Sequence, residues 1–172
     1  MQNENHILLF TDGSVNTKTN AGWGAFLSVS DSELQVENLK QNVKLKRFEE
    51  TSSSKLEIQT LIWALSETLN FKGKITVYTD SQTIVGLHGR RIRLEKNDYH
   101  SKSGRQINNY ELYREFFKLT DQINCEFIKI EGHKQSGMKD KLDRIFTLVD
   151  RASRNAVRGE NDVKSQPTKL GK

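Results

Sequence analysis

Short apolar runs of strand character alternate along the chain with longer segments in which apolar residues recur every three or four positions. Residues 7–10 are four consecutive apolar side chains followed by Thr-Asp-Gly-Ser, which predicts a buried central strand that ends at Asp12. Residues 75–78 repeat this order, because a β-branched and aromatic run again leads into Thr-Asp and a small residue, with the aspartate at Asp80. Each of these two strands therefore delivers one carboxylate at its end.

Three further strands follow from alternation of apolar and polar positions. After a polar loop at residues 15–20, residues 22–30 place every second side chain on an apolar face, and residues 33–50 alternate again. Together with residues 7–12 these segments predict an antiparallel meander of three strands. Residues 125–130 form the last strand.

Helical periodicity marks the other ordered parts of the chain, and Ser52 to Ser54 provide a cap signal for the first helix. The expected helices are residues 55–70, a short one from 82 to about 87, residues 109–123, and residues 139–158 with Gly159 as the terminator. Residues 88–108 show no periodicity and are expected to form a loop.

Asp12 and Asp80 are candidates for a metal site. If their strands are neighbours, the two carboxylates lie a few ångströms apart and repel each other unless a divalent cation sits between them. Glu57, in the first turn of the first helix, would face this pair if the helix begins beside the same edge of the sheet. The ordinary structural alternatives are an Asp-Gly turn at Asp12 and a surface glutamate that compensates the helix dipole at Glu57.

Composition narrows the class of partner. The chain has 172 residues with 27 Lys and Arg against 22 Asp and Glu, a net charge of +5 and a pI of about 9.3. This balance favours a polyanionic partner, with simple solubility as the weaker explanation. A single cysteine, Cys125, suits a reducing compartment, and no stretch approaches the roughly 18 apolar residues of a membrane span. We expect a cytoplasmic protein without membrane contact.

The loop at residues 88–108 has a local excess of positive charge, with six basic side chains against two acidic ones. A solvated, disordered excursion is the ordinary explanation for such a loop. In a basic protein with a candidate phosphate-handling site we favour a nucleic-acid contact. The domain organisation is then one domain at residues 1–159, with a basic insertion at 88–108 and a disordered basic tail at 160–172.

Four motifs in a fixed order carry a resemblance to a known family. They are Thr-Asp-Gly-Ser on the first strand, Ser-Ser-Ser-Lys-Leu-Glu at the first helix, Tyr-Thr-Asp-Ser-Gln on the fourth strand and Gly-His-Lys after the fifth. From about residue 7 to residue 158 the chain resembles ribonuclease HI. The resemblance implies an α/β fold, the ribonuclease H-like fold: a five-stranded mixed sheet with strands 1 to 3 antiparallel and helices on both faces.

The same resemblance assigns the site residues. It implies that Asp12, Glu57 and Asp80 are catalytic metal ligands and that His133 is a mobile catalytic histidine, whereas a surface loop histidine is the ordinary alternative. The fourth carboxylate is assigned to Asp150, because Asp150-Arg151-Ala152-Ser153-Arg154 matches the family's helical turn. Asp143 is the rival, because it lies 10 residues past His133 whereas Asp150 lies 17 residues past it, longer than the usual spacing.

The activity implied by the resemblance is endonucleolytic hydrolysis of the RNA strand of RNA–DNA hybrids, with little sequence specificity. Two Mg²⁺ ions, with Mn²⁺ as a substitute, would leave 5′-phosphate and 3′-hydroxyl ends. We expect a monomer. Two alternatives stay open, a non-catalytic hybrid-binding module and a DNA-directed nuclease of the same superfamily. The expected substrate contacts are Gly13, Ser14, Ser53, Ser54, Arg90, Arg91 and Arg93.

Three departures from the family pattern bear on substrate binding. The glycine-rich loop after the first motif is shortened, serines 53 and 54 stand where asparagines often do, and the basic segment contains no tryptophan. We expect these changes to leave the chemistry intact and to alter affinity or the preferred substrate length.

Overall fold

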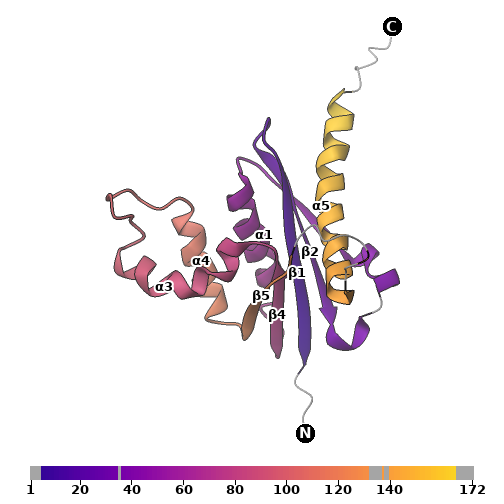
Figure 1. Ribbon diagram of the computed structural model, residues 1–172, viewed down its shortest axis with the longest axis horizontal. Coiled ribbons are helices and arrows are strands. Elements are labelled where there is room, and N and C mark those ends of the chain that lie inside the picture. Colours follow the sequence, from indigo (N-terminus) through magenta and orange to yellow (C-terminus); the bar gives the residue numbers. More distant parts are fainter. Residues whose placement is uncertain (1–4, 35, 132–136, 138–139, 166–172) are drawn as a thin grey trace.

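A five-stranded mixed sheet forms the centre of the molecule (Figure 1). The computed structural model describes residues 5–34, 36–131, 137 and 140–165. The sheet order is β3-β2-β1-β4-β5, in which β1 pairs antiparallel with β2 and parallel with β4. The strands are β1 (His6–Asn16), β2 (Ala21–Ser30), β3 (Lys44–Phe48), β4 (Lys74–Thr79) and β5 (Cys125–Lys129). The predicted mixed sheet with an antiparallel meander of strands 1 to 3 is confirmed.

Helices cover both faces of this sheet. The long helix α5 lies on one face, and α1 and α4 lie on the other (Figure 1). The helices are α1 (Ser53–Glu67), α2 (Gln82–Val85), α3 (Leu87–Lys96), α4 (Tyr110–Thr120) and α5 (Lys141–Ser165). Three short 3-10 turns connect β2 to β3, namely Asp31–Glu33, Val36–Asn38 and Lys40–Asn42.

The apolar run of β1 is explained by burial on both faces. Side chains alternate across a strand, so Leu9 enters the core beneath α1 while Leu8 and Phe10 enter the core beneath α5. A strand covered on both sides needs apolar residues at consecutive positions rather than at every second one. This is why residues 7–10 of β1, the central strand of the sheet, are all apolar.

Glycines in β1 and β2 let α1 approach the sheet closely. A Cβ at Gly24 would lie 2.2 Å from Thr60 Oγ1, and a Cβ at Gly13 would lie 2.8 Å from Leu56 Cδ2. Gly13 and Gly24 are also cross-strand partners. Because neither glycine has a side chain, the N-terminal half of α1 packs closely on the sheet at this pair.

Two boundaries of the predicted strands are wrong. Strand β1 does not end at Asp12 but continues to Asn16, because Asp12, Gly13 and the next three residues still pair with β2. The predicted loop at residues 15–20 is accordingly reduced to a turn at residues 17–20. The predicted third strand at 33–50 is ordered as a strand only over Lys44–Phe48, since the 3-10 turns take up most of the segment before it.

The predicted loop at residues 88–108 is partly wrong, because Leu87–Lys96 forms helix α3. Leu87 and Leu94 are buried in the core shared with α1 and α4. The remaining residues up to α4 contain one isolated bridge, between His100 and Gln106. The basic insertion is therefore a helix with a return segment.

The predicted end of the last helix at Gly159 is also wrong, because α5 continues through this glycine to Ser165. Glu160 pairs with Arg47 of β3, and Asn16 Nδ2 at the end of β1 donates to Asn161 Oδ1 at 2.8 Å. These contacts hold the extra turns against the sheet. Residues 160–165 are thus helical rather than a disordered tail, and residues 166–172 lie outside the described residues.

Across the described part of the chain, none of the helices combines the length and the apolar character that crossing a bilayer requires.

Candidate active site

Asp12 and Asp80 lie side by side in the sheet. The last paired residues of β1 and β4 are Phe10 and Tyr78, and each aspartate stands two positions further along the chain, Asp12 within β1 and Asp80 directly after β4. Neighbouring strands are about 4.8 Å apart, so the same register brings the two carboxyl groups to one point on the sheet. Parallel pairing ends there, which opens a space beside Asp12 while its other neighbour, Ala25 of β2, is still paired.

The surroundings of Asp12 disfavour its negative charge. Burial is the largest cause, and it raises the pKa of the Asp12 carboxyl from 3.8 to about 8 together with the charge of Asp80. The backbone N–H of Gly13 donates to the carboxylate and opposes this rise, whereas the charge of Asp150 and a hydrogen bond with it add to the rise. The carboxyl groups of Asp12 in β1, Asp80 after β4 and Asp150 in α5 therefore act on one another. No basic side chain contributes to the raised pKa of Asp12.

Helix α5 is fixed to β1 at the level of Asp150. Ser153 is fully buried, and its hydroxyl donates to the carbonyl of Asp150 at 3.0 Å while lying 3.1 Å from the hydroxyl of Ser14. Because a serine hydroxyl has one proton, Ser14 is the donor in the second bond. Arg154 Nε donates to Asp150 Oδ1 at 2.7 Å, which restrains the carboxylate itself.

Asp143, the rival for the fourth position, has a part in starting α5. Its Oδ2 accepts from the backbone N–H of Asp140 at 3.1 Å, and its own N–H donates to Asp140 Oδ1 at 2.8 Å. This reciprocal pair is a capping box, which satisfies two backbone donors at the helix N-terminus. The structure thus brings Asp150 to Asp12 and gives Asp143 a capping contact.

Glu57 lies in the second turn of α1, not in the first turn as predicted, because the helix already begins at Ser53 after the cap residue Ser52. Its carboxylate accepts a hydrogen bond of 2.6 Å from the hydroxyl of Ser81. Ser81 follows Asp80 directly and also caps α2 by accepting from the N–H of Ile84. Glu57 is therefore held beside the end of β4.

The donor set suits a hard divalent cation in its chemistry. All four side chains offer carboxylate oxygens, the ligands that Mg²⁺ prefers, and the mutual repulsion at Asp12 is the kind that a cation relieves. Within the residues that the structure describes, no group of three or more His, Cys, Asp or Glu side chains is arranged so that it could hold a metal ion. The carboxylates of Glu57 and Asp150 accept hydrogen bonds from Ser81 and Arg154 through one oxygen each, and each carboxylate has further lone pairs to offer a metal.

The other predicted site residues are spread around this point. His133 falls outside the described residues. Gly13 does not form a turn, but lies within β1 opposite Gly24 and beneath Leu56. Ser53 and Ser54 are exposed on the first turn of α1, and Ser14 is hydrogen-bonded to Ser153.

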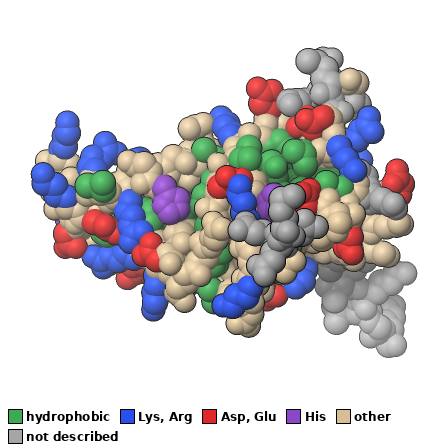
Figure 2. All heavy atoms as spheres, turned by 90° about the horizontal axis from the view of Figure 1, so that it is seen from below, with side chains coloured by type: hydrophobic (Ala, Val, Ile, Leu, Met, Phe, Trp, Pro, Cys, Tyr) green, Lys and Arg blue, Asp and Glu red, His purple; other side chains and the backbone are tan. Residues whose placement is uncertain are grey.

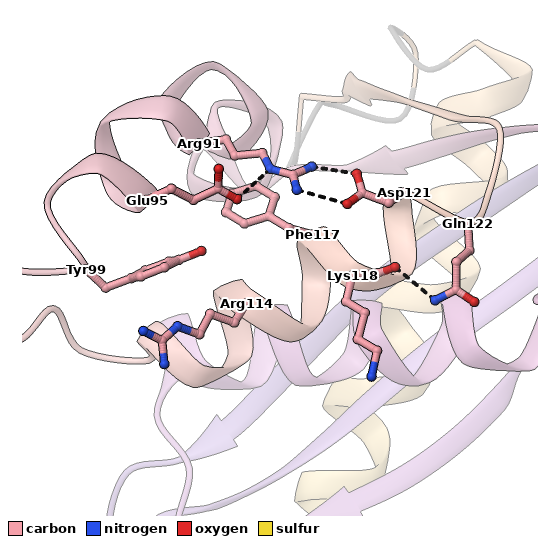
Figure 3. A pocket seen from close by; sticks show the side chains of 8 residues that line it. All are labelled: Arg91, Glu95, Tyr99, Arg114, Phe117, Lys118, Asp121 and Gln122. Carbon is pink, nitrogen blue, oxygen red and sulfur yellow. Dashed lines mark hydrogen bonds and ion pairs between the residues drawn. The ribbon is translucent and has the colours of Figure 1, made fainter.

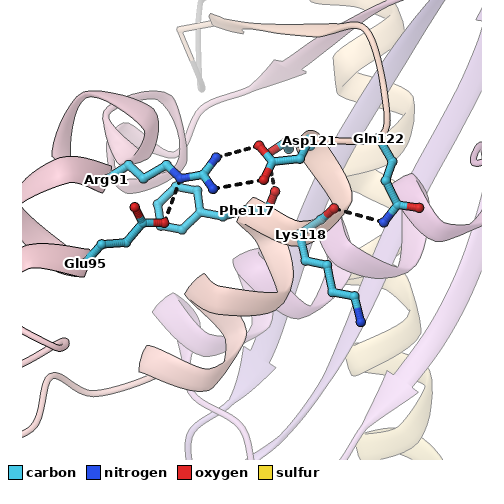
Figure 4. A network of polar contacts seen from close by, with 7 residues as sticks. Arg91, Glu95, Phe117, Lys118, Asp121 and Gln122 are labelled. Carbon is cyan, nitrogen blue, oxygen red and sulfur yellow. Dashed lines mark hydrogen bonds and ion pairs between the residues drawn. The ribbon is translucent and has the colours of Figure 1, made fainter.

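Two of the three predicted arginine contacts are engaged within the protein. Arg90 donates to the carbonyls of Gly86 and Thr83. Arg91 pairs with Glu95 and, through two nitrogens, with Asp121 at the C-terminal end of α4 (Figure 4). Arg91 also lies over the ring of Phe117. Only Arg93 is exposed on the surface of α3. Arg90 and Arg91 thus tie α3 to its neighbours, and the contact of all three arginines with substrate stays a prediction.

The groove between α3 and α4 encloses a pocket of about 560 Å³. Tyr99 and Arg114 lie on one side and Arg91, Phe117 and Asp121 on the other (Figure 3). Arg114 stacks on Tyr99 and pairs with Asp98 at 2.9 Å. These contacts stabilise the return segment after α3.

Sequence reasoning missed three side chains that orient the carboxylates: Ser81, Ser153 and Arg154. A signal for two of them was present, since a serine directly after a strand often caps the next helix and an arginine four residues after an aspartate lies on the same helical face. The bond between Ser14 and Ser153 joins residues 139 positions apart, and no local pattern indicates it.

Comparison with known proteins supports one family. The RNase H family model matches residues 4–155. Ribonuclease H of Chlorobaculum parvum is 26% identical over 85% of this chain and 96% of its own length. The solution structure of the PFV RNase H domain superposes with a TM-score of 0.70 at 13% identity, covering 91% of this chain and 96% of that one.

A foamy viral protease-reverse transcriptase in complex with an RNA/DNA hybrid superposes with a TM-score of 0.64 at 9% identity, covering 88% of this chain and 20% of that one. At such identities the two structures support the fold alone. The family model, by contrast, spans most of the sequence. The chain belongs to the RNase H family of hydrolytic nucleases.

Proposed function

We propose that the chain cuts the RNA strand of RNA–DNA hybrids internally and that Asp12, Glu57, Asp80 and Asp150 carry the chemistry. The observation that supports this most strongly is the meeting of Asp12, Asp80 and Asp150 at the point where β1 and β4 separate. Such an arrangement is costly for folding, since like charges in a partly buried site repel. It is typical of a site that is completed by cations.

Two Mg²⁺ ions, or Mn²⁺ in their place, would activate a water molecule, stabilise the leaving 3′ oxygen and thereby yield 5′-phosphate and 3′-hydroxyl ends. The protein's own contribution is to hold the oxygen donors at fixed places. Asp12 and Asp80 are held by the sheet register, Asp150 by Arg154 and Ser153, and Glu57 by Ser81. We assign His133 to proton transfer or product release next to this group.

Recognition of the hybrid rests on groups beside the carboxylates. The 2′-hydroxyl distinguishes RNA from DNA because it both donates and accepts hydrogen bonds. The backbone at Gly13, the hydroxyls of Ser14, Ser53 and Ser54, and the carboxylate of Glu57 are candidates to bind it. Arg93 on α3 would bind phosphate, which carries no sequence information, so we propose little sequence specificity.

We also propose that the protein is a monomer and that it works in the cytoplasm. Its proposed substrate is of the kind bound by the foamy viral enzyme, an RNA/DNA hybrid. Charge complementarity supports the nucleic-acid partner, since the chain is basic overall. Figure 2 shows Lys and Arg side chains toward both ends of the molecule.

The test is cleavage of an end-labelled RNA–DNA hybrid beside RNA–RNA, DNA–DNA and single-stranded controls, with Mg²⁺, Mn²⁺ or chelator. The proposal expects metal-dependent internal cuts in only the RNA of the hybrid, and RNA products that a polymerase can extend because they end in a 3′-hydroxyl. Binding without cleavage under both metals would instead identify a non-catalytic binding module. Cuts in duplex DNA would favour a DNA-directed nuclease.

A further inference from the structure

Three arginines form a row along the outer face of α5. Arg144, Arg151 and Arg158 are spaced by seven residues, which is two helical turns, so they share one face and follow one another at intervals of about 10 Å. All three side chains are exposed. The opposite face of the helix, with Ile145, Phe146 and Val149, is buried against the sheet.

The arginine row differs from most other arginines of the molecule in its partners. Arg47, Arg91, Arg114 and Arg154 each pair with a carboxylate within the protein. Among the residues that the structure describes, no ion pair joins Arg144, Arg151 or Arg158 to an acidic side chain. Their positive charges are therefore available to a partner outside the chain.

The position of the row relates it to the candidate active site. Arg151 directly follows Asp150, so the row passes the level of the carboxylates and extends along α5 in both directions. Helix α3, which carries the exposed Arg93, lies at the other end of the molecule (Figure 1). The carboxylates of β1 and β4 stand between these two basic surfaces.

We propose that the arginine row of α5 binds phosphates of the RNA–DNA hybrid outside the cleavage point. This inference rests on the proposed function and adds a second contact to it. Guanidinium groups bind phosphate oxygens through two nitrogens at once, and a row along a rigid helix contacts a backbone without reading bases. An anionic membrane is a poorer match, because a helix that lies on a bilayer inserts an apolar face, and that of α5 is buried.

The test measures how binding depends on salt. The full-length protein and the double variant Arg144→Gln/Arg158→Gln are titrated with fluorescein-labelled hybrids in chelator, over a range of KCl concentrations. Arg151 is left intact because it adjoins Asp150. Each lost phosphate contact reduces the slope of log K against log[salt] by about 0.9, so we expect a decrease of about 2 and roughly tenfold weaker binding at low salt.

The control is Lys72→Gln/Lys118→Gln, which removes the same charge at two exposed sites away from α5, before β4 and on α4. Hybrids of about 12 and about 36 base pairs are compared, since the row lies outside the cleavage point and requires a longer duplex. The inference is supported if the slope of log K against log[salt] is lower in the arginine variant alone. This variant should also have a higher KM on the long hybrid and an unchanged kcat on the short one.

Equal slopes in the two double variants would overturn the inference and leave the proposed function standing, provided that the parent protein still cleaves the hybrid. The inference would also be overturned if the parent bound phosphatidylglycerol vesicles through these arginines in preference to the hybrid. A parent protein that neither binds nor cleaves the hybrid would overturn both proposals.

Discussion

Asp12 has an environment that an ordinary surface turn does not explain. It lies inside a paired strand, next to Asp80 by register, and in contact with Asp150. Burying carboxylates without a positive partner costs several kcal/mol, which folding must offset elsewhere. The apolar cores on both faces of β1 supply such an offset.

At the fourth carboxylate, we predict that Asp150→Asn and Asp143→Asn have different effects. Asp150→Asn should lower kcat by about 100-fold or more with little change in stability, because the carboxylate is a proposed metal ligand. Asp143→Asn should lower the free energy of unfolding by about 0.5–1 kcal/mol and leave kcat within about threefold, because it removes charge from a helix N-terminus. Steady-state kinetics and urea unfolding of both variants measure this.

The two variants serve as controls for each other, since both convert an aspartate of α5 to its amide. An Asp143 variant that is folded but inactive, beside an active Asp150 variant, would reverse the assignment. Isothermal titration with Mg²⁺ gives a second measure, because only Asp150→Asn is expected to weaken metal binding.

At the scale of elements, the close packing of α1 on Gly13 and Gly24 of the sheet controls where Glu57 lies. We predict that Gly24→Ala destabilises the protein by about 1–3 kcal/mol, because the new Cβ would meet Thr60 Oγ1 at 2.2 Å. It should also lower activity, since α1 has to move away from β2. Chemical denaturation and hybrid cleavage measure the two effects.

Gly159→Ala is the matched glycine variant. Gly159 lies within α5, and an added Cβ would have no neighbour within 4 Å. We expect stabilisation of about 0.5–1 kcal/mol, because alanine has the higher helix propensity. A destabilised Gly159→Ala protein would indicate that the helix ends at this glycine after all.

The attachment of α3 to α4 is expected to depend on pH. Hydrogen bonds from Arg91 lower the pKa of Asp121 below its ordinary value of 3.8. A lowered folded-state pKa contributes stability that is present above the unfolded-state pKa and is lost as the pH falls through the folded-state pKa. We predict that Arg91→Gln raises the pKa of Asp121, measured by NMR titration, and reduces the loss of thermal stability below about pH 4. An unchanged Asp121 titration would contradict this pairing.

The elements that were predicted well are those with local signals. Ser52 caps α1 as expected from the serine run, and the apolar stripes of α1 and α4 enter one core. Helix α3 was missed because pairs such as that of Arg91 with Asp121, 30 residues away, stabilise it. The last turns of α5 were missed for the same reason, since Glu160 and Asn161 contact residues more than 100 positions away.

At the scale of the whole molecule, topology brings the site together. The parallel pairing of β1 with β4 sets Asp80 beside Asp12, and α5 crosses the opposite face to bring in Asp150. Repetition of the strand-Thr-Asp pattern was enough to predict the first pair. The bond from Ser81 to Glu57 and the bond between Ser14 and Ser153 could not be predicted, because they depend on how the helices pack on the folded sheet.

The same topology separates the chemistry from the basic surfaces. Carboxylates occupy the middle of the molecule, while exposed arginines lie on α3 and along α5 at its two ends (Figures 1 and 2). A long duplex could then be held at both ends while one phosphodiester lies at Asp12. This arrangement is consistent with the proposed catalysis and the proposed sequence-independent binding in one domain.

The most direct measurement of the central claim compares the wild-type protein with Asp80→Asn, recording hybrid binding in chelator and RNA cleavage in Mg²⁺. The amide keeps the size of the side chain but removes a proposed metal ligand, so binding should stay within about threefold while the cleavage rate falls by about 1,000-fold or more. If Asp80→Asn cleaves the RNA as fast as the wild type, the carboxylates of Asp12 and Asp80 are not the catalytic site.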